Sequence, residues 1–195
     1  MAIFRHKKKA NKPAPIECEV EIHDLSHEGQ GVSRSQDKVL FVAGALPSET
    51  VQVKIDSQKR HFNQGQIVKI LKPSTERVEP SCGHYKRCGA CQLQHLDSSK
   101  QIGYKLNTLD QQLKRQLKLE TIPWEASLES KAFGYRRRAR LGVRYRNKTD
   151  EIILGFREEA NSHLTSISDC PVLEPELNRL VKPLHSLISS LEAKG

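Results

Sequence analysis

Three cysteines within ten residues constrain this chain more than any other feature. Cys82, Cys88 and Cys91 form a C-x5-C-x2-C segment, and Gly83 and Gly89 beside them let the backbone turn tightly. Thiols gathered in this way typically bind a metal, whereas unpaired structural cysteines in one exposed loop would be vulnerable to oxidation. The segment therefore predicts a loop built around a metal centre.

An all-sulfur tetrahedral site needs a fourth ligand, and Cys170 is the candidate. Pro171 follows it, as a proline follows the last ligand of bacterial ferredoxin motifs. Four thiolates suit either zinc or an iron–sulfur cluster. Zinc sites usually combine two short Cys/His pairs, and the sequence has no second cysteine pair, although His84 and His95 could complete a zinc site. The residues thus indicate a metal and leave zinc open as an alternative to iron–sulfur.

The excess positive charge of the chain is concentrated in two short segments. Of the 32 Lys and Arg residues, twelve lie in residues 1–12 and 131–146, which contain no acid, and the rest of the chain has 20 basic against 23 acidic residues. Such dense charge of one sign repels itself unless a polyanion neutralises it, and a phosphate backbone is the usual polyanion. A solvated surface or an acidic protein partner is the alternative. The residues expected to contact RNA are Lys7, Lys8, Lys9, Arg136, Arg138, Arg140, Arg144 and Arg146.

Alternation of polar and apolar residues predicts several short strands in the first third of the chain. The pattern occurs over residues 17–23, 38–44, 51–55 and 65–71, with turn residues between the strands. Short strands at this spacing favour a small closed barrel. Cys18 falls on the apolar side of the first strand, so we interpret it as a small core residue and not as a ligand.

Two later segments have the spacing of amphipathic helices. Apolar residues recur every three or four positions from Ile102 to Leu117, and Asp97 is the expected N-cap. A second stripe runs from Leu173 to Leu191 and predicts a core or partner-facing helix. Pro183 lies within it and predicts a kink or a break.

Three further strands are expected between these helices, at Tyr135–Tyr145, Glu151–Arg157 and His163–Ile167. Side chains alternate between the two faces of a strand. If the first strand has its expected length, five arginines form a ridge along one face: Arg136, Arg138, Arg140, Arg144 and Arg146. Guanidinium groups bind phosphate and stack on bases, so the ridge is expected to face RNA.

The fold class expected from these patterns is mixed β and α+β. We expect a basic disordered tail at residues 1–14, an OB-like β-barrel at 15–73, a linker with the cysteine loop at 74–96, and a central α+β domain at 97–195. No apolar run approaches the roughly 18 residues of a spanning helix, and the basic start lacks the apolar stretch of a signal peptide. The expectation is a cytoplasmic protein with no membrane or DNA partner.

The ordered set of motifs resembles a known family. Residues 24–32 and 41–49 resemble the TRAM RNA-binding barrel. Together with the cysteine loop, residues 134–141, 155–157 and 167–173, they resemble the iron–sulfur-bearing bacterial 23S rRNA (uracil-C5)-methyltransferases. The resemblance covers essentially the whole chain. It implies a [4Fe-4S] cluster on Cys82, Cys88, Cys91 and Cys170, with 23S ribosomal RNA held by the barrel and the central domain.

The resemblance also implies parts that the sequence does not contain. Family members are longer, and their carboxy-terminal half binds S-adenosylmethionine and supplies a cysteine that attacks C6 of the uracil. This chain has no Gly-rich strand-to-helix turn for such a cofactor and no spare cysteine in a catalytic context. We therefore expect the amino-terminal part of a methyltransferase, from a truncated or split reading frame, that is inactive without a separate catalytic chain or half. The alternative is a stand-alone RNA-binding iron–sulfur or zinc module without enzymatic activity.

Overall fold

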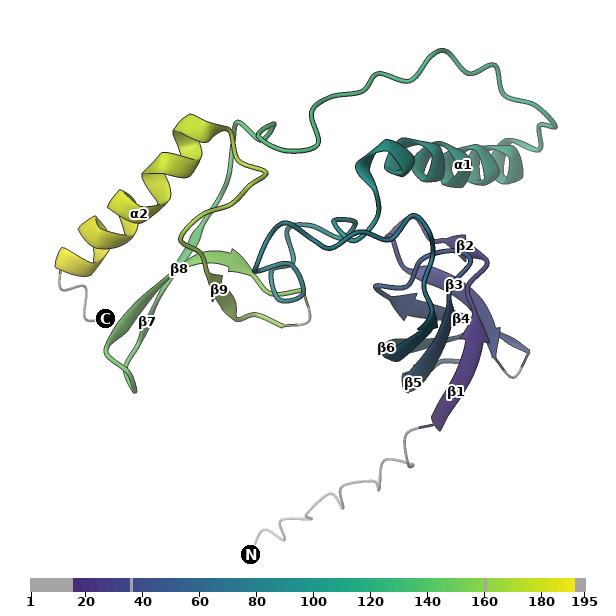
Figure 1. Cartoon of the computed structure of the whole chain (residues 1–195), viewed down its shortest axis with the longest axis horizontal. Coiled ribbons are helices and arrows are strands. Elements are labelled where there is room, and N and C mark those ends of the chain that lie inside the picture. The colour runs from purple at the N-terminus through teal and green to yellow at the C-terminus, as the bar shows by residue number, and fades with distance from the viewer. Residues whose placement is uncertain (1–15, 36, 160, 192–195) are drawn as a thin grey trace, which may run out of the picture.

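The computed structural model describes residues 16–35, 37–159 and 161–191, which form two sheets and two helices joined by an irregular segment (Figure 1). The first sheet comprises β1 (Ile16–Glu21), β2 (Asp24–Leu25), β3 (Gly31–Ser35), β4 (Lys38–Ala43), β5 (Thr50–Gln58) and β6 (Phe62–Lys72). The predicted tail at residues 1–14, with Lys7, Lys8 and Lys9, lies outside the described residues. The mixed β and α+β class predicted from the sequence is confirmed.

The six strands run in the order β1-β5-β6-β4-β3-β2, and all neighbours are antiparallel except β4 and β6. The sheet curls so that the chain after β1 meets β3. The His23 N–H donates to the Val32 carbonyl at 2.9 Å, and the Ser33 hydroxyl donates to the Glu21 carbonyl at 2.6 Å. These bonds join opposite ends of the sheet and give the barrel that the alternating pattern predicts.

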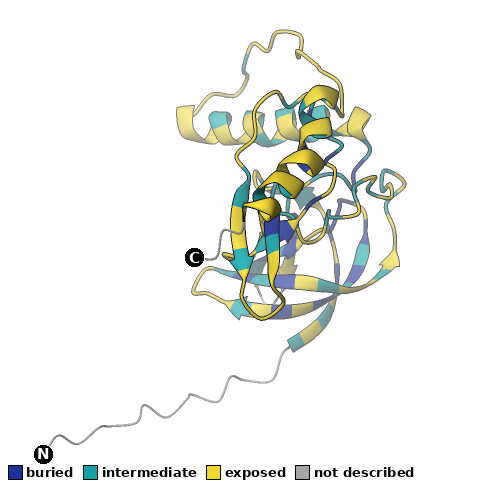
Figure 2. Ribbon diagram, turned by 90° about the vertical axis from the view of Figure 1, so that its left-hand side faces the viewer, coloured by how far each residue is buried: buried dark blue, intermediate teal, exposed yellow. Residues whose placement is uncertain are grey.

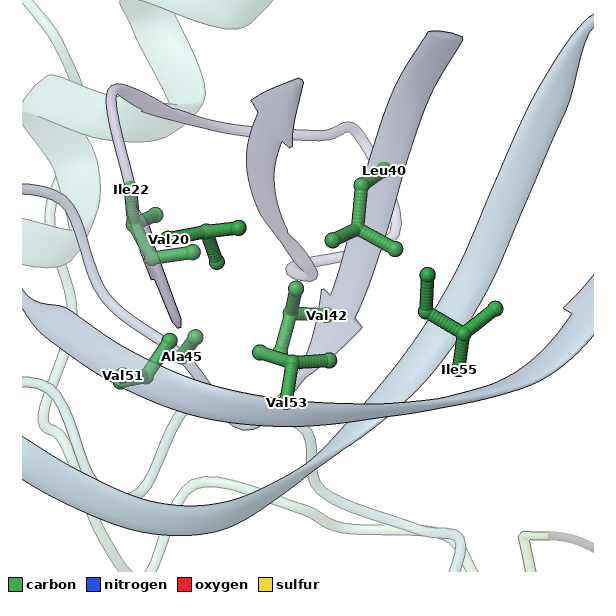
Figure 3. Packing of buried hydrophobic residues seen from close by; sticks show 8 residues of the cluster. All are labelled: Val20, Ile22, Leu40, Val42, Ala45, Val51, Val53 and Ile55. Atoms are coloured by element: carbon green, nitrogen blue, oxygen red, sulfur yellow. The ribbon is translucent and has the colours of Figure 1, made fainter. Parts of the chain in front are cut away.

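The barrel interior is filled by branched aliphatic side chains (Figure 3). Cys18 packs partly buried against this cluster, which confirms its interpretation as a core residue. A Cβ at Gly65 would lie 2.5 Å from the Val53 side chain, so only glycine lets β5 and β6 approach there. The buried residues of this barrel core are Val20, Ile22, Leu40, Val42, Ala45, Val51, Val53 and Ile55.

A buried ion pair attaches the segment after β6 to the barrel. The Glu49 carboxylate is fully buried and accepts from Arg77 Nε at 2.6 Å and Nη2 at 2.9 Å. Its oxygens also accept from the backbone N–H of Leu46 and of Ser74. Burial alone would raise the pKa of Glu49, but these hydrogen bonds and the guanidinium charge hold the pKa below its ordinary value. The carboxylate therefore stays ionised and fixes the start of the linker.

The helix α1 (Ser98–Leu117) follows the cysteine loop and lies beside the barrel (Figure 1). Asp97 is its N-cap, as predicted, and accepts from the Ser99 N–H at 2.9 Å. No residue of α1 is fully buried, and Figure 2 shows most of its surface exposed. A small cluster of Leu25, Leu46 and Leu96, with Leu93 and Tyr104 packed against it, joins the barrel, the linker and α1.

The second sheet contains β7 (Gly142–Arg146), β8 (Glu151–Arg157) and β9 (Leu164–Ser166), all antiparallel in that order. The helix α2 (Pro175–Ser190) runs beside it. The core of this region, formed with a residue of α2, contains Ile167, Cys170, Val172, Leu173 and Val181. Neither helix in the described part of the chain has the length and apolar character that crossing a membrane requires.

The strand predicted at Tyr135–Tyr145 is wrong in its start: it begins only at Gly142, because the backbone of Arg136 pairs with Leu173 and its neighbours and not with β8. A kink or a break was predicted at Pro183, and the break is absent: α2 continues through this proline, which is exposed. The strand predicted at Glu151–Arg157 has the limits of β8.

Candidate metal centre

The cysteine loop is folded by its own backbone hydrogen bonds. The Cys82 carbonyl accepts from the Tyr85 N–H at 3.0 Å, and the His84 carbonyl accepts from the N–H groups of Arg87 at 3.1 Å and Cys88 at 2.9 Å. Successive turns of this kind wrap the chain around one point. They bring three thiols that are close in sequence close together in space.

Backbone contacts with residues at the end of β8 also hold the loop in place. Cys88 and Glu158 form an isolated antiparallel bridge, and the Gly89 N–H donates to the Arg157 carbonyl at 2.9 Å. A Cβ at Gly89 would lie 3.0 Å from the backbone of Glu159 and 3.1 Å from the Arg157 oxygen. The absence of a side chain at Gly89 lets the two backbones approach closely, and the loop belongs structurally to the second sheet as well as to the linker.

Cys170 follows β9 and lines the same cavity as the cysteines of the loop. It is buried in the core beneath α2, and its N–H donates to the Asn178 side chain of that helix at 2.7 Å. Its carbonyl accepts from the Leu173 N–H at 3.0 Å. The helix thus positions the fourth cysteine.

All four predicted ligands line one small cavity, of about 10 Å³, which is close to the volume that one water molecule needs. Within the described residues, no group of three or more Cys, His, Asp or Glu side chains is spaced to hold a metal ion. The structure thus brings the four thiols to one cavity. The cavity is lined by Cys82, His84, Tyr85, Cys88, Ala90, Cys91, Gln94, Phe156, Ile167, Asp169 and Cys170.

The thiols of this cavity influence one another electrostatically. Burial raises the pKa of Cys88 and of Cys170 above the ordinary cysteine value, and the charges of neighbouring cysteines raise both further. A metal binds thiolates, so binding here would release protons and relieve this mutual repulsion. Four soft donors around one cavity fit an all-sulfur metal group by their chemistry.

Two residues around the loop have roles that sequence reasoning did not assign. The Tyr85 hydroxyl donates to the Gln92 carbonyl at 2.6 Å and also contacts Nδ1 of His95. Burial and the nearby Arg77 charge lower the pKa of His95 to about 4, so the ring is neutral at pH 7. His84 lines the cavity, but His95 is used to hold Tyr85. Of the two histidines considered for a zinc site, only His84 is near the thiols.

The predicted arginine ridge is only partly formed. Arg144 and Arg146 share one face of β7, whereas Arg136, Arg138 and Arg140 lie in an irregular segment before it. Arg136 anchors that segment beside the Cys170 loop, because its N–H donates to the Val172 carbonyl and its own carbonyl accepts from the Glu174 N–H.

The arginines also differ in their acidic neighbours. Arg146 lies 3.5 Å from Glu151, and Arg137 lies 3.8 Å from Glu174. Arg138, Arg140 and Arg144 are exposed, and within the described residues they form no ion pair. These three guanidinium groups are therefore available to an external anion.

Comparison with known proteins gives the relationships of this chain. Residues 17–68 match the TRAM domain family, as the sequence motifs predicted. The chain is 46% identical over 174 residues to the 23S rRNA (uracil(1939)-C(5))-methyltransferase RlmD of Erwinia tasmaniensis, covering 89% of this chain and 40% of that protein. It is 42% identical over 189 residues to the enzyme of the same name from Vibrio cholerae, covering 97% of this chain and 43% of that protein. The chain thus spans about two fifths of the length of these relatives.

A solved structure supports the fold independently. The chain matches the crystal structure of Pyrococcus abyssi tRNA (uracil-54, C5)-methyltransferase in complex with S-adenosyl-L-homocysteine, with a TM-score of 0.58 and 24% identity. The match covers 89% of this chain and 37% of that one. The arrangement of barrel, linker and second sheet is therefore found in a solved protein.

Proposed function

We propose that this chain is the RNA-recognition and [4Fe-4S]-bearing portion of a 23S rRNA uracil-C5-methyltransferase. The chain carries a TRAM domain and is homologous over most of its length to enzymes of this kind. The observation that carries the proposal is the meeting of Cys82, Cys88, Cys91 and Cys170 at one cavity. Cys170 comes from a distant part of the chain, and the fold brings it to the loop.

A cluster is favoured over zinc by the order of the cysteines along the chain. Zinc sites usually combine two short Cys/His pairs. Here three cysteines lie within ten residues, and the fourth, Cys170, is followed by Pro171, as the last ligand of bacterial ferredoxin motifs is. With all four irons held by cysteine, the cluster would have a structural role. It would connect the linker to the second sheet.

Recognition of 23S rRNA is supported by the TRAM domain, by the names of the relatives and by the unpaired arginines near the Cys170 loop. Phosphate contacts from Arg138, Arg140 and Arg144 would orient the RNA relative to the metal centre. Such a role implies a cytoplasmic location, because ribosomal RNA is found there in bacteria.

Methyl transfer itself would require a region that binds S-adenosylmethionine, which we propose to be supplied by another segment or chain. The relatives are more than twice as long as the part that this chain matches. On α2 and at its C-cap, a stripe of exposed leucines is available to contact such a region: Leu180, Leu184, Leu187 and Leu191.

The first test is the content of iron, acid-labile sulfide and zinc in the chain purified without oxygen, together with its visible absorption spectrum. We expect about four irons and four sulfides per chain. Cys170→Ser should lose the cluster as fully as Cys88→Ser. Cys18→Ser is the matched control, since that thiol packs against the barrel core, and it should keep the cluster.

Other results would redirect the proposal. One zinc and no sulfide would show a zinc-stabilised RNA-binding module, and a full cluster in Cys170→Ser would remove that residue from the ligand set. Adding the remaining region of the Erwinia tasmaniensis relative should restore methyl transfer to rRNA. No restoration, with RNA binding intact, would favour the stand-alone module.

A further inference from the structure

A groove of about 300 Å³ lies between the β2–β3 turn of the barrel and α1. Its volume is at the lower end of the range of ligand sites in proteins. The barrel side of the groove is formed by residues 25–29, which lie within the TRAM match. The other side is formed by α1 and by residues 92–93, which follow the cysteine loop. The groove therefore lies where three parts of the molecule meet.

The floor of the groove is apolar and fixed in place. Leu25 and Leu93 belong to the small cluster that joins the barrel to the linker, and the Tyr104 ring packs against them. The Tyr104 hydroxyl donates to Glu76 at 2.7 Å, which holds the orientation of the ring. Leu109 continues this surface, with 44% of its surface exposed. A rigid apolar surface that includes an aromatic ring suits a flat, weakly hydrated ligand.

The rim of the groove carries polar groups that are not used within the protein. The side chains of Gln92, Lys105 and Gln112 line it, are exposed, and make no hydrogen bond or ion pair within the described residues. The other polar side chains of the groove have partners within the protein. Thr108 Oγ1 donates to the Leu25 carbonyl, Ser26 Oγ accepts from the Gln30 N–H, and the exposed Glu28 carboxylate lies 3.9 Å from His27. Free amide groups can both donate and accept, and a free ammonium attracts an anion.

We propose that this groove binds one unpaired RNA base, with Lys105 contacting an adjacent phosphate. A base has apolar faces that pack on the floor, and an edge of donors and acceptors that the two amides can meet. The sequence of α1 supports an anionic ligand, because residues 98–117 contain four basic residues and one acid. The inference rests on the proposed RNA-binding function and adds a base-binding site remote from the arginine segment.

The experiment uses the full chain with its metal centre and a single-stranded RNA oligonucleotide that contains 4-thiouridine. Leu109→Glu places a charge on the groove floor, whereas Leu117→Glu places the same charge at an exposed leucine of the same helix outside the groove. We expect Leu109→Glu to weaken binding about tenfold, as loss of one stacked base does. Leu117→Glu should change it less than threefold. Both variants should fold, because no residue of α1 is fully buried.

Two further measurements locate the base and the phosphate. Photo-crosslinks from 4-thiouridine should map to the peptides that contain Leu93 or Tyr104. Lys105→Ala should reduce the slope of log affinity against log salt by about 0.7, and Lys100→Ala, on the same helix but outside the groove, should reduce it less.

Several results would overturn the inference. Equal weakening by Leu109→Glu and Leu117→Glu would indicate general charge repulsion, and crosslinks confined to residues 136–146 would place the RNA elsewhere. If Arg138→Ala weakens binding while the groove variants do not, the groove proposal fails and the proposed function stands. If the chain binds no RNA at all, both fail.

Discussion

Individual residues at the edges of the cysteine loop carry much of its geometry, and glycines show this most directly. Gly83 and Gly89 both lie beside cysteines of the proposed ligand set, but their surroundings differ. A Cβ at Gly83 would meet nothing within 4 Å, whereas a Cβ at Gly89 would press on the backbone that follows β8. The same substitution at the two positions therefore separates local steric effects from general changes in the loop.

We predict that Gly89→Ala destabilises the chain by about 1–3 kcal/mol, the usual cost of overpacking, and lowers its iron content. Gly83→Ala should stay within about 0.5 kcal/mol of the wild type, as substitutions at open positions do. Thermal unfolding and iron analysis measure both effects. Equal behaviour of the two variants would contradict the close approach between Gly89 and Glu159.

Glu49 provides a second test at the residue scale. Removing its charge leaves the guanidinium of Arg77 without its partner, so Glu49→Gln should lower the free energy of unfolding by roughly 3 kcal/mol at pH 7. Glu19→Gln, at an exposed position of the same barrel, should have little effect.

The pH dependence follows from the lowered pKa of Glu49. Its contribution to stability is complete above the ordinary glutamate pKa and is lost as the pH falls through the lower folded value. The difference in stability between wild type and Glu49→Gln should therefore shrink in acid. Denaturant unfolding at a series of pH values measures it, and a constant difference down to pH 3 would contradict the assignment.

At the scale of elements, the arginine segment before β7 shows how backbone pairing arranges charge. Because Arg136 is anchored to the Cys170 loop, the arginines that follow it project from an irregular segment and from β7 instead of from one long strand. The resulting surface is less regular than a ridge. It still presents three exposed guanidinium groups that form no ion pair in the described part of the chain: those of Arg138, Arg140 and Arg144.

We predict that Arg138→Ala combined with Arg140→Ala weakens RNA binding and lowers the salt slope by about 0.7 to 0.9 for each lost phosphate contact. Arg137→Ala is the matched control, because that arginine already lies near Glu174. Affinity measured over a range of salt concentrations tests both. An unchanged slope in the double variant would exclude these residues from the RNA interface.

At the scale of the whole molecule, the cysteine loop is the connection between two separate cores. The buried residues of the barrel core lie between Val20 and Ile55, with Ile16, Cys18, Ile67 and Ile70 packed against them, whereas the second core includes Cys170 itself, with Cys91 packed against it. A metal group at the loop would therefore stabilise one core directly and the other only through the linker.

We predict that Cys170→Ser increases amide hydrogen exchange in residues 82–91 and 164–173, because these segments lose their common anchor. Exchange in β1, β4 and β5 should remain at the wild-type level, since their buried side chains belong to the barrel core. Hydrogen-exchange mass spectrometry distinguishes the regions. A uniform increase across the chain would show that the barrel also depends on the metal centre.

The sequence alone determined the features that repeat over a few residues. Alternation located β1, β4, β5 and β6, because side chains on one strand face alternate whatever the rest of the chain does. The buried side of Cys18 was predictable for the same reason. The strand predicted at Glu151–Arg157 has the limits of β8, and the Asp97 cap followed from the ability of that side chain to accept from the first helical N–H groups. The motifs also predicted the TRAM domain that comparison confirmed, while the limits set for the domains and the ligand set stay predictions.

The tertiary structure decided the features that depend on contacts between segments distant in the sequence. The pairing of Arg136 with Leu173 shortens β7, and it is made by backbone atoms, which are the same for almost every residue and leave no pattern in the sequence. The groove beside α1 likewise needs the barrel turn, the linker and the helix to be placed together. Cys170 could be proposed as a ligand from its chemistry. Only the packing of α2 on the second sheet brings it to the cavity of the other three cysteines. Hydrogen bonds and burial fix such distances between segments, whereas spacing in the sequence does not.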